Sequence, residues 1–278
     1  MAKTYKALLA ADMDFTLLSP GEDVPEGNKE AIKALKNAGV AFTIATGRSS
    51  FLVGKFAENL GIEVPIITSN GASLFDAGTR KHLVSRDFED QKIRSLLRLL
   101  MDKEADATLY SDEGIFFCPK SSRKYFVEGY NEGVEPAKQS PIIDIDRRFP
   151  ELDKIPAFNK ILLIRPDKEV ADIFLSDPEL VLISSGPGLY DVMCKGVSKG
   201  NALLELADYL GVPSDNTFAI GDSDNDLPMI ESAKYGIAVG NATDEIKKAA
   251  AYVSADYNSL GFAKAVYDFV IPLTEKFS

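Results

Sequence analysis

The sequence predicts an α/β protein with a Rossmann-like parallel sheet as its core and an inserted α+β domain. Its 278 residues are enough for two domains of ordinary size. Short apolar runs alternate with longer amphipathic stretches, which is the pattern of strands alternating with helices around a parallel sheet. These runs form two groups, and the long stretch between them has a different character. We therefore expect one domain to interrupt the other.

The first group of apolar runs precedes residue 87. Its predicted strands and helices cover, in order, residues 7–11, 28–38, 40–45, 50–60 and 65–68. The first strand is an uninterrupted apolar run that ends at Asp12. Apolar residues at helical spacing indicate the helix over 28–38, and Gly39 follows it as a cap. The next strand ends at Thr46, at the start of a Thr-Gly-Arg turn.

The second group begins at Lys199, where a helix is predicted to run to Leu210. Two strands follow, over 217–220 and 235–239, and they end at Gly221-Asp222 and Gly240-Asn241. These strands and the three of the first group are predicted to run parallel in one sheet.

The intervening stretch mixes helices and strands in another order. Its predicted elements are helices over 90–101 and 168–175 and strands over 108–110, 114–118, 160–165 and 181–184. The predicted domains are a discontinuous core over 1–86 and 191–278 and an inserted α+β domain over 87–190. The pairs Arg123-Lys124 and Arg147-Arg148 lie among acidic neighbours and are expected to be solvated surface.

The composition narrows the classes of partner. With 31 basic against 42 acidic residues, the net charge of −11 repels nucleic acid and anionic membranes. Two separated cysteines, Cys118 and Cys194, exclude a disulfide framework and a zinc ribbon, and both are expected to be small buried hydrophobes. The apolar run over 7–11 is too short for a signal peptide or a membrane span. A cytoplasmic protein without an obligate protein partner is the expectation.

Carboxylates dominate the predicted strand ends, where ligands bind in open parallel sheets. Asp12 and Asp14 follow the first strand, and Asp222 and Asp226 follow the strand over 217–220. Two like charges about 4 Å apart repel by ~4 kcal/mol at an effective dielectric constant near 20, so four converging carboxylates need a positive partner. Mg²⁺ fits, since it accepts carboxylates together with waters and a substrate phosphate.

Lys199 opens the helix of the second group and is the candidate lysine of a site for phosphoryl transfer. A carboxylate that attacks phosphorus forms an aspartyl phosphate, which divides a difficult hydrolysis into two easier steps. Each residue also has a purely structural interpretation. Asp12 can be a helix cap, Lys199 a solvated side chain, and residues 222–226 a turn followed by a capped helix.

Taken together, these residues resemble the haloacid dehalogenase (HAD) superfamily, specifically its Cof-type phosphatases with a large cap, subclass IIB. Four motifs occur in the family's order, at residues 12–18 (DMDFTLL), 44–48 (IATGR), 196–200 (GVSKG) and 221–226 (GDSDND). The fragments TSNGA at 68–72 and VGNA at 239–242 are also Cof-like. The resemblance covers the predicted core from end to end and implies that the inserted domain is the cap.

The resemblance implies a role for each matching residue. Asp12 would be the nucleophile, and Asp14 would protonate the leaving oxygen and then activate the water. Mg²⁺ would be held by Asp12, the Asp14 carbonyl and Asp222, with Asp226 orienting that shell. The residues that would bind the phosphoryl group are Thr46, the Gly47 amide, Lys199 and Asn225. Arg48 and Asn70 are further candidates for contact with the substrate.

One position departs from the family pattern. Phe15 stands where the first motif usually has glycine, and its ring is expected to face the cap and narrow the space for the leaving group. The substrate range is therefore in question more than the chemistry. His82, the only histidine, lies near the predicted domain joint and is expected to be a surface or hinge residue.

The leading hypothesis is a Mg²⁺-dependent phosphatase that hydrolyses small phosphorylated metabolites such as sugar phosphates. A phosphomutase shares every core residue, so the sequence leaves that alternative open. A non-catalytic sensor of phosphorylated ligands is the third alternative, and the occupied catalytic positions disfavour it. Specificity is expected to lie in cap loops such as residues 184–188, which carry no transferable motif.

Overall fold

The computed structural model describes residues 4–19, 21 and 23–277. By their contacts the residues form two compact units. The first unit comprises Met1–Thr46, Phe56–Leu83 and Ser198–Ser278, and the second comprises Gly47–Lys55 and Val84–Val197. The second unit contains the predicted insertion over 87–190, but it also takes in the segment 47–55 and the flanking residues 84–86 and 191–197. That one unit is a catalytic core and the other its cap stays a prediction.

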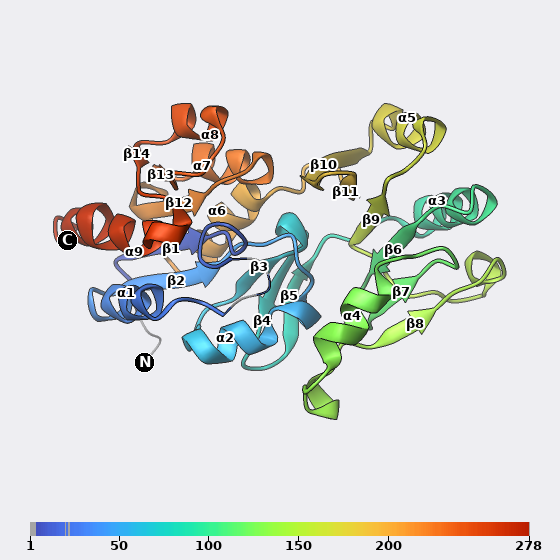
Figure 1. Cartoon of the computed structure of the whole chain (residues 1–278), viewed down its shortest axis with the longest axis horizontal. Coiled ribbons are helices and arrows are strands. Elements are labelled where there is room, and N and C mark those ends of the chain that lie inside the picture. Colours follow the sequence, from blue (N-terminus) through green and yellow to red (C-terminus); the bar gives the residue numbers. More distant parts are fainter. Residues whose placement is uncertain (1–3, 20, 22, 278) are drawn as a thin grey trace. The chain divides into compact units, whose positions relative to one another are not determined.

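A five-stranded parallel sheet forms the centre of the first unit (Figure 1). Its strands, in spatial order, are β14 (Tyr252–Val253), β13 (Tyr235–Ala238), β12 (Thr217–Gly221), β1 (Ala7–Ala11) and β2 (Val40–Ile44). Every residue of β1 is buried, because the strand has a neighbour on each side and is covered on both faces. The parallel α/β core predicted from the apolar runs is confirmed.

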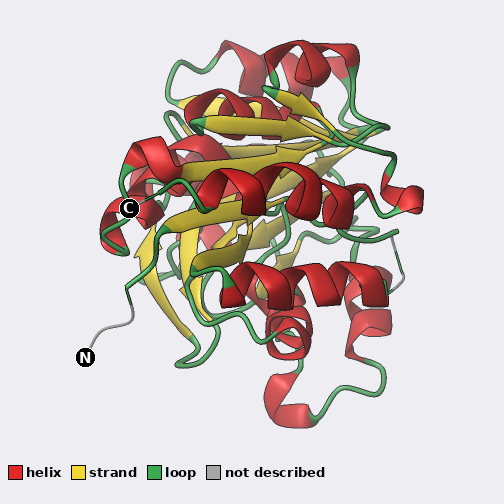
Figure 2. Cartoon of the chain, turned by 90° about the vertical axis from the view of Figure 1, so that its left-hand side faces the viewer, coloured by secondary structure: helices red, strands yellow, loops and turns green. Residues whose placement is uncertain are grey.

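Helices pack along this sheet, as Figure 2 shows. The α-helices that lie wholly within the first unit are α1 (Glu26–Asn37), α6 (Lys199–Tyr209), α7 (Leu227–Ser232), α8 (Asp244–Ala249), α9 (Gly261–Ala265) and α10 (Ile271–Thr274). The amphipathic helix α1 buries Ala31, Ile32 and Leu35, the apolar positions that indicated it. The predicted helix over 50–60 is divided into a 3₁₀ turn, Ser50–Leu52, and α2 (Gly54–Leu60), along which the chain returns to the first unit.

The expectation that residues 65–68 form a strand of the main sheet is wrong. That segment, β3 (Ile66–Thr68), belongs to a separate three-stranded sheet with β4 (Ser73–Asp76) and β5 (Lys81–Ser85). A single parallel bridge, between Ala45 and Ile67, links it to the end of β2. β3 pairs along its whole length with the antiparallel strand β4 but meets the end of β2 only at this bridge, so it belongs to the three-stranded sheet.

The second unit contains a six-stranded sheet with three helices. Its strands, in spatial order, are β10 (Leu180–Gly186), β11 (Leu189–Cys194), β9 (Lys160–Ile164), β6 (Ala107–Tyr110), β7 (Ile115–Phe117) and β8 (Ile142–Asp144). The helices are α3 (Asp90–Asp102), α4 (Lys124–Asn131) and α5 (Lys168–Ser176). Four of these strands and two of the helices were predicted, whereas β8, β11 and α4 were not.

A buried ion pair lies within this second sheet. Lys160 Nζ is 2.9 Å from Asp191 Oδ1, and both side chains are almost completely buried. The same ammonium group donates to the backbone oxygen of Gly47 at 2.6 Å and lies 4.4 Å from the ring centre of Tyr110. The pair therefore joins β9 to β11 and holds the start of the segment 47–55.

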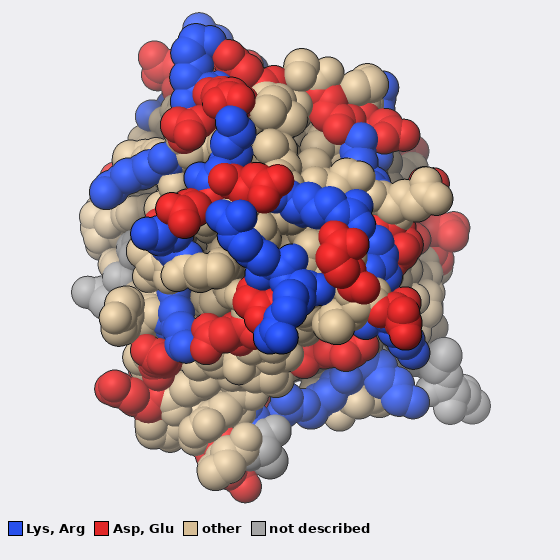
Figure 3. All heavy atoms as spheres, turned by 90° about the vertical axis from the view of Figure 1, so that its right-hand side faces the viewer, with Lys and Arg blue, Asp and Glu red and all other residues tan. Residues whose placement is uncertain are grey.

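The two basic pairs expected to be solvated surface differ in their exposure. On the face drawn in Figure 3, lysine and arginine side chains are interspersed with acidic ones. Arg148 is exposed and pairs with Asp146. Arg123 is instead half-buried, with its guanidinium 3.7 Å from the ring centre of Phe126. None of the helices formed by the described residues combines the length and apolar character needed to cross a bilayer.

Replacing Lys160 by methionine tests the buried pair. Breaking such a pair leaves an uncompensated buried carboxylate, so Lys160→Met should destabilise the second unit by about 3–5 kcal/mol. Lys124→Met is the matched control, because Lys124 pairs with Asp144 at the surface, where an ion pair contributes at most about 1 kcal/mol. Urea unfolding of both variants measures the difference. Equal, small losses would show that the Lys160–Asp191 pair contributes no more than a surface pair.

Candidate functional site

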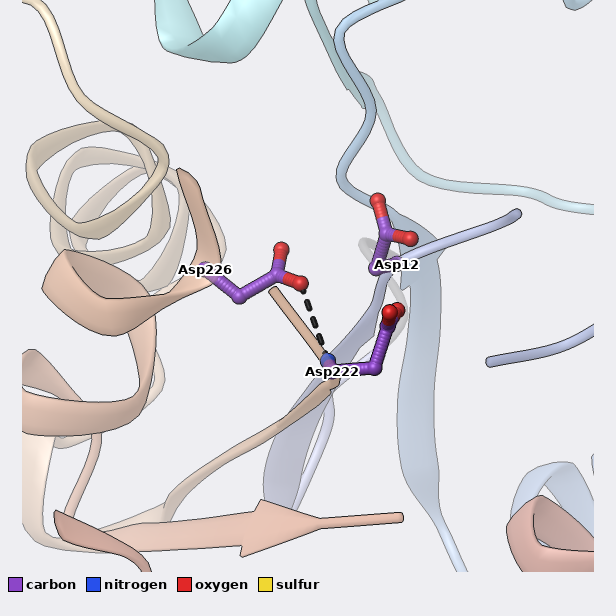
Figure 4. Close-up of side chains that lie close together, drawn as sticks. All are labelled: Asp12, Asp222 and Asp226. Carbon is purple, nitrogen blue, oxygen red and sulfur yellow. Dashed lines mark hydrogen bonds between the residues drawn. The ribbon is translucent and has the colours of Figure 1, made fainter. Parts of the chain in front are cut away.

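The acidic residues of the first and fourth motifs converge at one edge of the main sheet. Because β1 and β12 are parallel neighbours, their carboxyl ends lie side by side. Asp12 follows β1, and Asp222 follows β12. Oxygens of Asp12, Asp222 and Asp226 lie within 4.8 Å of one another. Figure 4 shows the three side chains close together.

Asp226 is fixed by its own loop. It ends a 3₁₀ turn, Asp224–Asp226, whose capping residue is Ser223. The Asp226 Oδ2 atom accepts hydrogen bonds from the backbone N–H groups of Asp222, at 3.0 Å, and Ser223, at 3.1 Å. The interpretation of residues 222–226 as a turn followed by a capped helix is therefore correct only in part. The 3₁₀ turn is capped by Ser223, whereas α7, which begins at Leu227, has no side-chain cap. The Asp226 carboxylate also faces Asp12 and Asp222.

Lys199 is the positive partner of this cluster. Its side chain is fully buried, and Nζ lies 2.6 Å from Asp12 Oδ1 and 2.6 Å from Asp226 Oδ1. It is the first residue of α6, and the preceding Ser198 caps that helix through its side chain. The alternative interpretation of Lys199 as a solvated surface residue is therefore wrong. Asp12 extends from a strand end to this lysine, so its interpretation as a helix cap is also wrong.

A close backbone contact positions the start of α6. Gly71 has φ +96°, and a Cβ atom built on it would lie 2.1 Å from the backbone oxygen of Ser198. Only glycine permits both this conformation and this approach. The Ser69-Asn70-Gly71 turn therefore supports the backbone from which Lys199 extends.

The cluster carries an excess of buried negative charge. Burial, together with the charges of Asp226 and Asp222, raises the pKa of Asp12 well above its usual range. Burial and the charge of Asp226 likewise raise the pKa of Asp222 to about 7. Burial alone would lower the pKa of Lys199, but Asp12 and Asp226 raise it above its usual range. One ammonium group does not balance the charge of three carboxylates, so the cluster favours binding of a further cation. Its possible ligands are all oxygen atoms, which suits Mg²⁺.

Thr46, Asn70 and Asn225 form a chain of contacts beside the cluster. Thr46 is buried at the end of β2, and its backbone oxygen accepts from the Asn70 N–H at 3.0 Å. Asn225 Nδ2 donates to Asn70 Oδ1 at 3.2 Å. Because Asn225 lies within the turn that carries Asp226, these contacts join the ends of β2 and β12 through the 69–71 turn.

Asp14 and Thr16 lie in the loop that follows β1. Thr16 Oγ1 donates to Asp222 Oδ1 at 2.9 Å, a contact that sequence reasoning did not assign although Thr16 is part of the first motif. The backbone of Asp14 forms an isolated β-bridge with that of Leu18. The charge of Asp14 contributes to the raised pKa of Asp222. The structure therefore brings this loop against the second acidic segment.

Gly47 and Arg48 are placed differently from the other predicted site residues. They directly follow Thr46 in the chain, but by their contacts they belong to the second unit. Gly47 is held there through its backbone oxygen by Lys160. Their assignment to phosphate binding stays a prediction.

Phe15 adopts a conformation that suits the glycine expected there, with φ 63°. Its ring packs edge-on against Tyr257 of the same unit, with ring centres 5.6 Å apart, and 45% of the residue is exposed. His82 lies in β5, where its Nδ1 atom is 2.6 Å from Ser73 Oγ, outside the acidic cluster. Of the two cysteines, Cys118 is buried and Cys194 is half-buried.

Comparisons with known proteins agree with the motif order. A family model described as haloacid dehalogenase-like hydrolase matches residues 9–266. The 5-amino-6-(5-phospho-D-ribitylamino)uracil phosphatase YwtE of Bacillus subtilis is 31% identical over 278 residues, which cover 92% of this chain and 95% of that protein. The resemblance stated from the motifs is thereby confirmed.

Solved structures match in fold along nearly the whole chain. A haloacid dehalogenase-like hydrolase from B. subtilis has a TM-score of 0.79 and 26% identity, covering 95% of this chain and 99% of that one. The HAD subclass IIB sugar phosphatase BT4131 has the same TM-score at 23% identity, with 95% and 99% covered. The fold expected from the motifs is therefore present.

Substitution of Gly221 tests how tightly Asp226 is held. A Cβ atom at position 221 would lie 2.6 Å from Cβ and Cγ of Asp226, so Gly221→Ala forces that side chain or its loop to move. We expect a loss of about 1–3 kcal/mol, the usual cost of overpacking. Gly129→Ala is the control, because nothing lies within 4 Å of that position in α4. It should be neutral or stabilising, and thermal melting compares the two; an unchanged melt for Gly221→Ala would contradict the packing.

Proposed function

We propose, since the chain belongs to the haloacid dehalogenase-like hydrolases, that it is a Mg²⁺-dependent phosphatase acting on small phosphorylated metabolites such as sugar phosphates. The observation that carries the proposal is the buried Lys199 ammonium between Asp12 and Asp226, with Asp222 beside them. This arrangement combines a nucleophile, a donor set for a divalent cation and a cation for the phosphoryl group. The name of the B. subtilis relative, a 5-amino-6-(5-phospho-D-ribitylamino)uracil phosphatase, supports a small phosphorylated metabolite as the substrate class.

The residues divide the reaction into two steps. In the first, an oxygen of Asp12 attacks phosphorus, the bond to the substrate oxygen breaks, and Asp14 supplies the proton that the leaving alcohol takes. In the second, Asp14 takes a proton from water, the water oxygen attacks the aspartyl phosphate, and inorganic phosphate leaves while the Asp12 carboxylate is restored. The two steps together need one carboxylate that attacks phosphorus, Asp12, and one that transfers protons, Asp14.

Negative charge on the phosphoryl group requires compensation. Asp12, Asp222 and the Asp14 carbonyl would hold Mg²⁺, and Asp226 would orient that shell. When bound, the ion supplies positive charge that neutralises carboxylate repulsion and polarises the phosphoryl oxygens. Lys199 keeps its charge in this buried site because two carboxylates contact it. The proposed contacts of the phosphoryl group and substrate are Thr46, Gly47, Lys199, Asn225, Arg48 and Asn70.

Replacing Asp12 by asparagine tests the nucleophile. Asparagine keeps the shape of the side chain but cannot form the ester, so Asp12→Asn should lower kcat for p-nitrophenyl phosphate by about a thousandfold or more. The matched control is Asp215→Asn, an exposed carboxylate of the same unit. Activity retained by Asp12→Asn would refute the assignment.

Product analysis with a sugar phosphate as substrate distinguishes the three candidate functions. Release of inorganic phosphate supports a phosphatase, and an isomerised sugar phosphate without release of phosphate indicates a mutase. If neither product forms, a sensor is indicated.

Thermal melting tests the cation site without relying on turnover. A ligand that binds only the folded state stabilises it by RT ln(1 + [L]/Kd), about 2.7 kcal/mol at a hundred times Kd. Mg²⁺ should therefore raise the melting temperature of the wild-type protein, and a chelator should reverse the shift. Asp222→Asn should lose most of the shift, while Asp215→Asn should keep it. If both variants respond alike, the ion binds elsewhere.

A further inference from the structure

The loop that carries Asp12 and Asp14 contains a strained residue. Phe15 has φ 63°, in the left-handed region that bulky side chains rarely occupy. Hydrogen bonds within the loop close it, from Phe15 N–H to the Leu18 oxygen at 2.8 Å and from Leu17 N–H to the Met13 oxygen at 2.9 Å. A strained conformation persists only when surrounding contacts hold it in place, so the contacts of Phe15 with other segments matter.

Asn241 supplies such a contact from the loop that follows β13. Its Nδ2 atom donates to the backbone oxygen of Phe15 at 3.0 Å. Its Oδ1 atom accepts from the backbone N–H of Tyr257 at 3.1 Å, and the Tyr257 ring packs edge-on against the Phe15 ring. An asparagine amide offers both a donor and an acceptor, so one side chain binds the two aromatic residues that contact each other.

The same two loops also meet at the acidic cluster. Thr16, next to Phe15, donates to Asp222 Oδ1, and the backbone N–H of Thr243 donates to the backbone oxygen of Asp222 at 3.0 Å. The loop after β1 is thus held at two successive residues, at Phe15 by Asn241 and at Thr16 by Asp222. Asp14 immediately precedes this pair of attachments.

We propose that Asn241 is a positioning residue for the phosphatase reaction, acting through the backbone of Phe15 to fix Asp14 relative to Asp12. The inference rests on the proposed function, because Asp14 is the group that transfers protons there. Asn241 itself need not touch the substrate. A small displacement of a proton donor from its productive position lowers the rate of chemistry more than it weakens binding.

The decisive variant is Asn241→Asp. Aspartate keeps the acceptor for Tyr257 N–H but has no donor for the Phe15 oxygen. We expect kcat for p-nitrophenyl phosphate to fall about tenfold, with KM changed less than about twofold, as for loss of orientation rather than of binding. Asn258→Asp is the matched control, since it adds the same charge at an exposed position next to Tyr257 and should leave kcat unchanged.

Introducing Asn241→Asp into the variant Phe15→Gly distinguishes a loss of loop positioning from a general loss of folding stability. Glycine adopts the left-handed conformation without strain, so the loop needs less support from Asn241. In this background the further change Asn241→Asp should lower kcat by less than about threefold. An equal loss in both backgrounds, or an unchanged kcat for Asn241→Asp alone, would overturn the proposal.

Amide hydrogen exchange measures how firmly the loop is held and does not depend on enzymatic activity. Residues 13–18 should exchange faster in Asn241→Asp than in the wild-type protein, and Asn258→Asp should not change them. Unchanged exchange in Asn241→Asp would overturn the positioning role. If the wild-type protein with Mg²⁺ hydrolyses none of a panel of phosphate esters while the exchange result holds, the proposed function fails but the attachment of this loop to Asn241 stands.

Discussion

The buried ammonium group of Lys199 is the interaction on which the candidate site depends. Carboxylates removed from water in this way cost several kcal/mol each unless they have partners. Lys199 meets two of them at 2.6 Å and has no exposed surface. The segments around it, from β1, β12 and α6, are far apart in the sequence, and the fold must bring all three together before these charges are tolerable. Formation of the site and formation of the core sheet are therefore coupled.

The cluster holds more negative than positive charge. If the positive and negative charges were equal in number, the cluster would be a structural ion pair. Three carboxylates beside one lysine instead favour the binding of a further cation. The acidic loop after β12 serves two purposes at once, because Asp226 closes its own turn and also contacts Lys199. The same residue thus belongs to local structure and to the site.

Sequence reasoning predicted the features that depend on local pattern. The apolar run of β1, its termination at Asp12 and the position of Lys199 at the start of a helix all appear in the chain order. It failed where partners are distant. β11 has a central aspartate that argues against a buried strand, and only its pairing with Lys160 on β9 makes that burial possible. Similarly, residues 65–68 form a strand as predicted, but their antiparallel partner decides which sheet they join. Asn241 was noticed only as part of a motif, since its contacts with Phe15 and Tyr257 exist only in the folded chain.

The contact between Gly71 and the start of α6 bears on how this protein can vary. Any side chain at position 71 would press on the Ser198 carbonyl group, and the lysine that follows would be displaced with it. A residue without a side chain and without charge is therefore as constrained as the ionic groups. Surveys of natural or laboratory variants should find position 71 closed to substitution, and its intolerance would have a steric origin in a site whose chemistry is electrostatic.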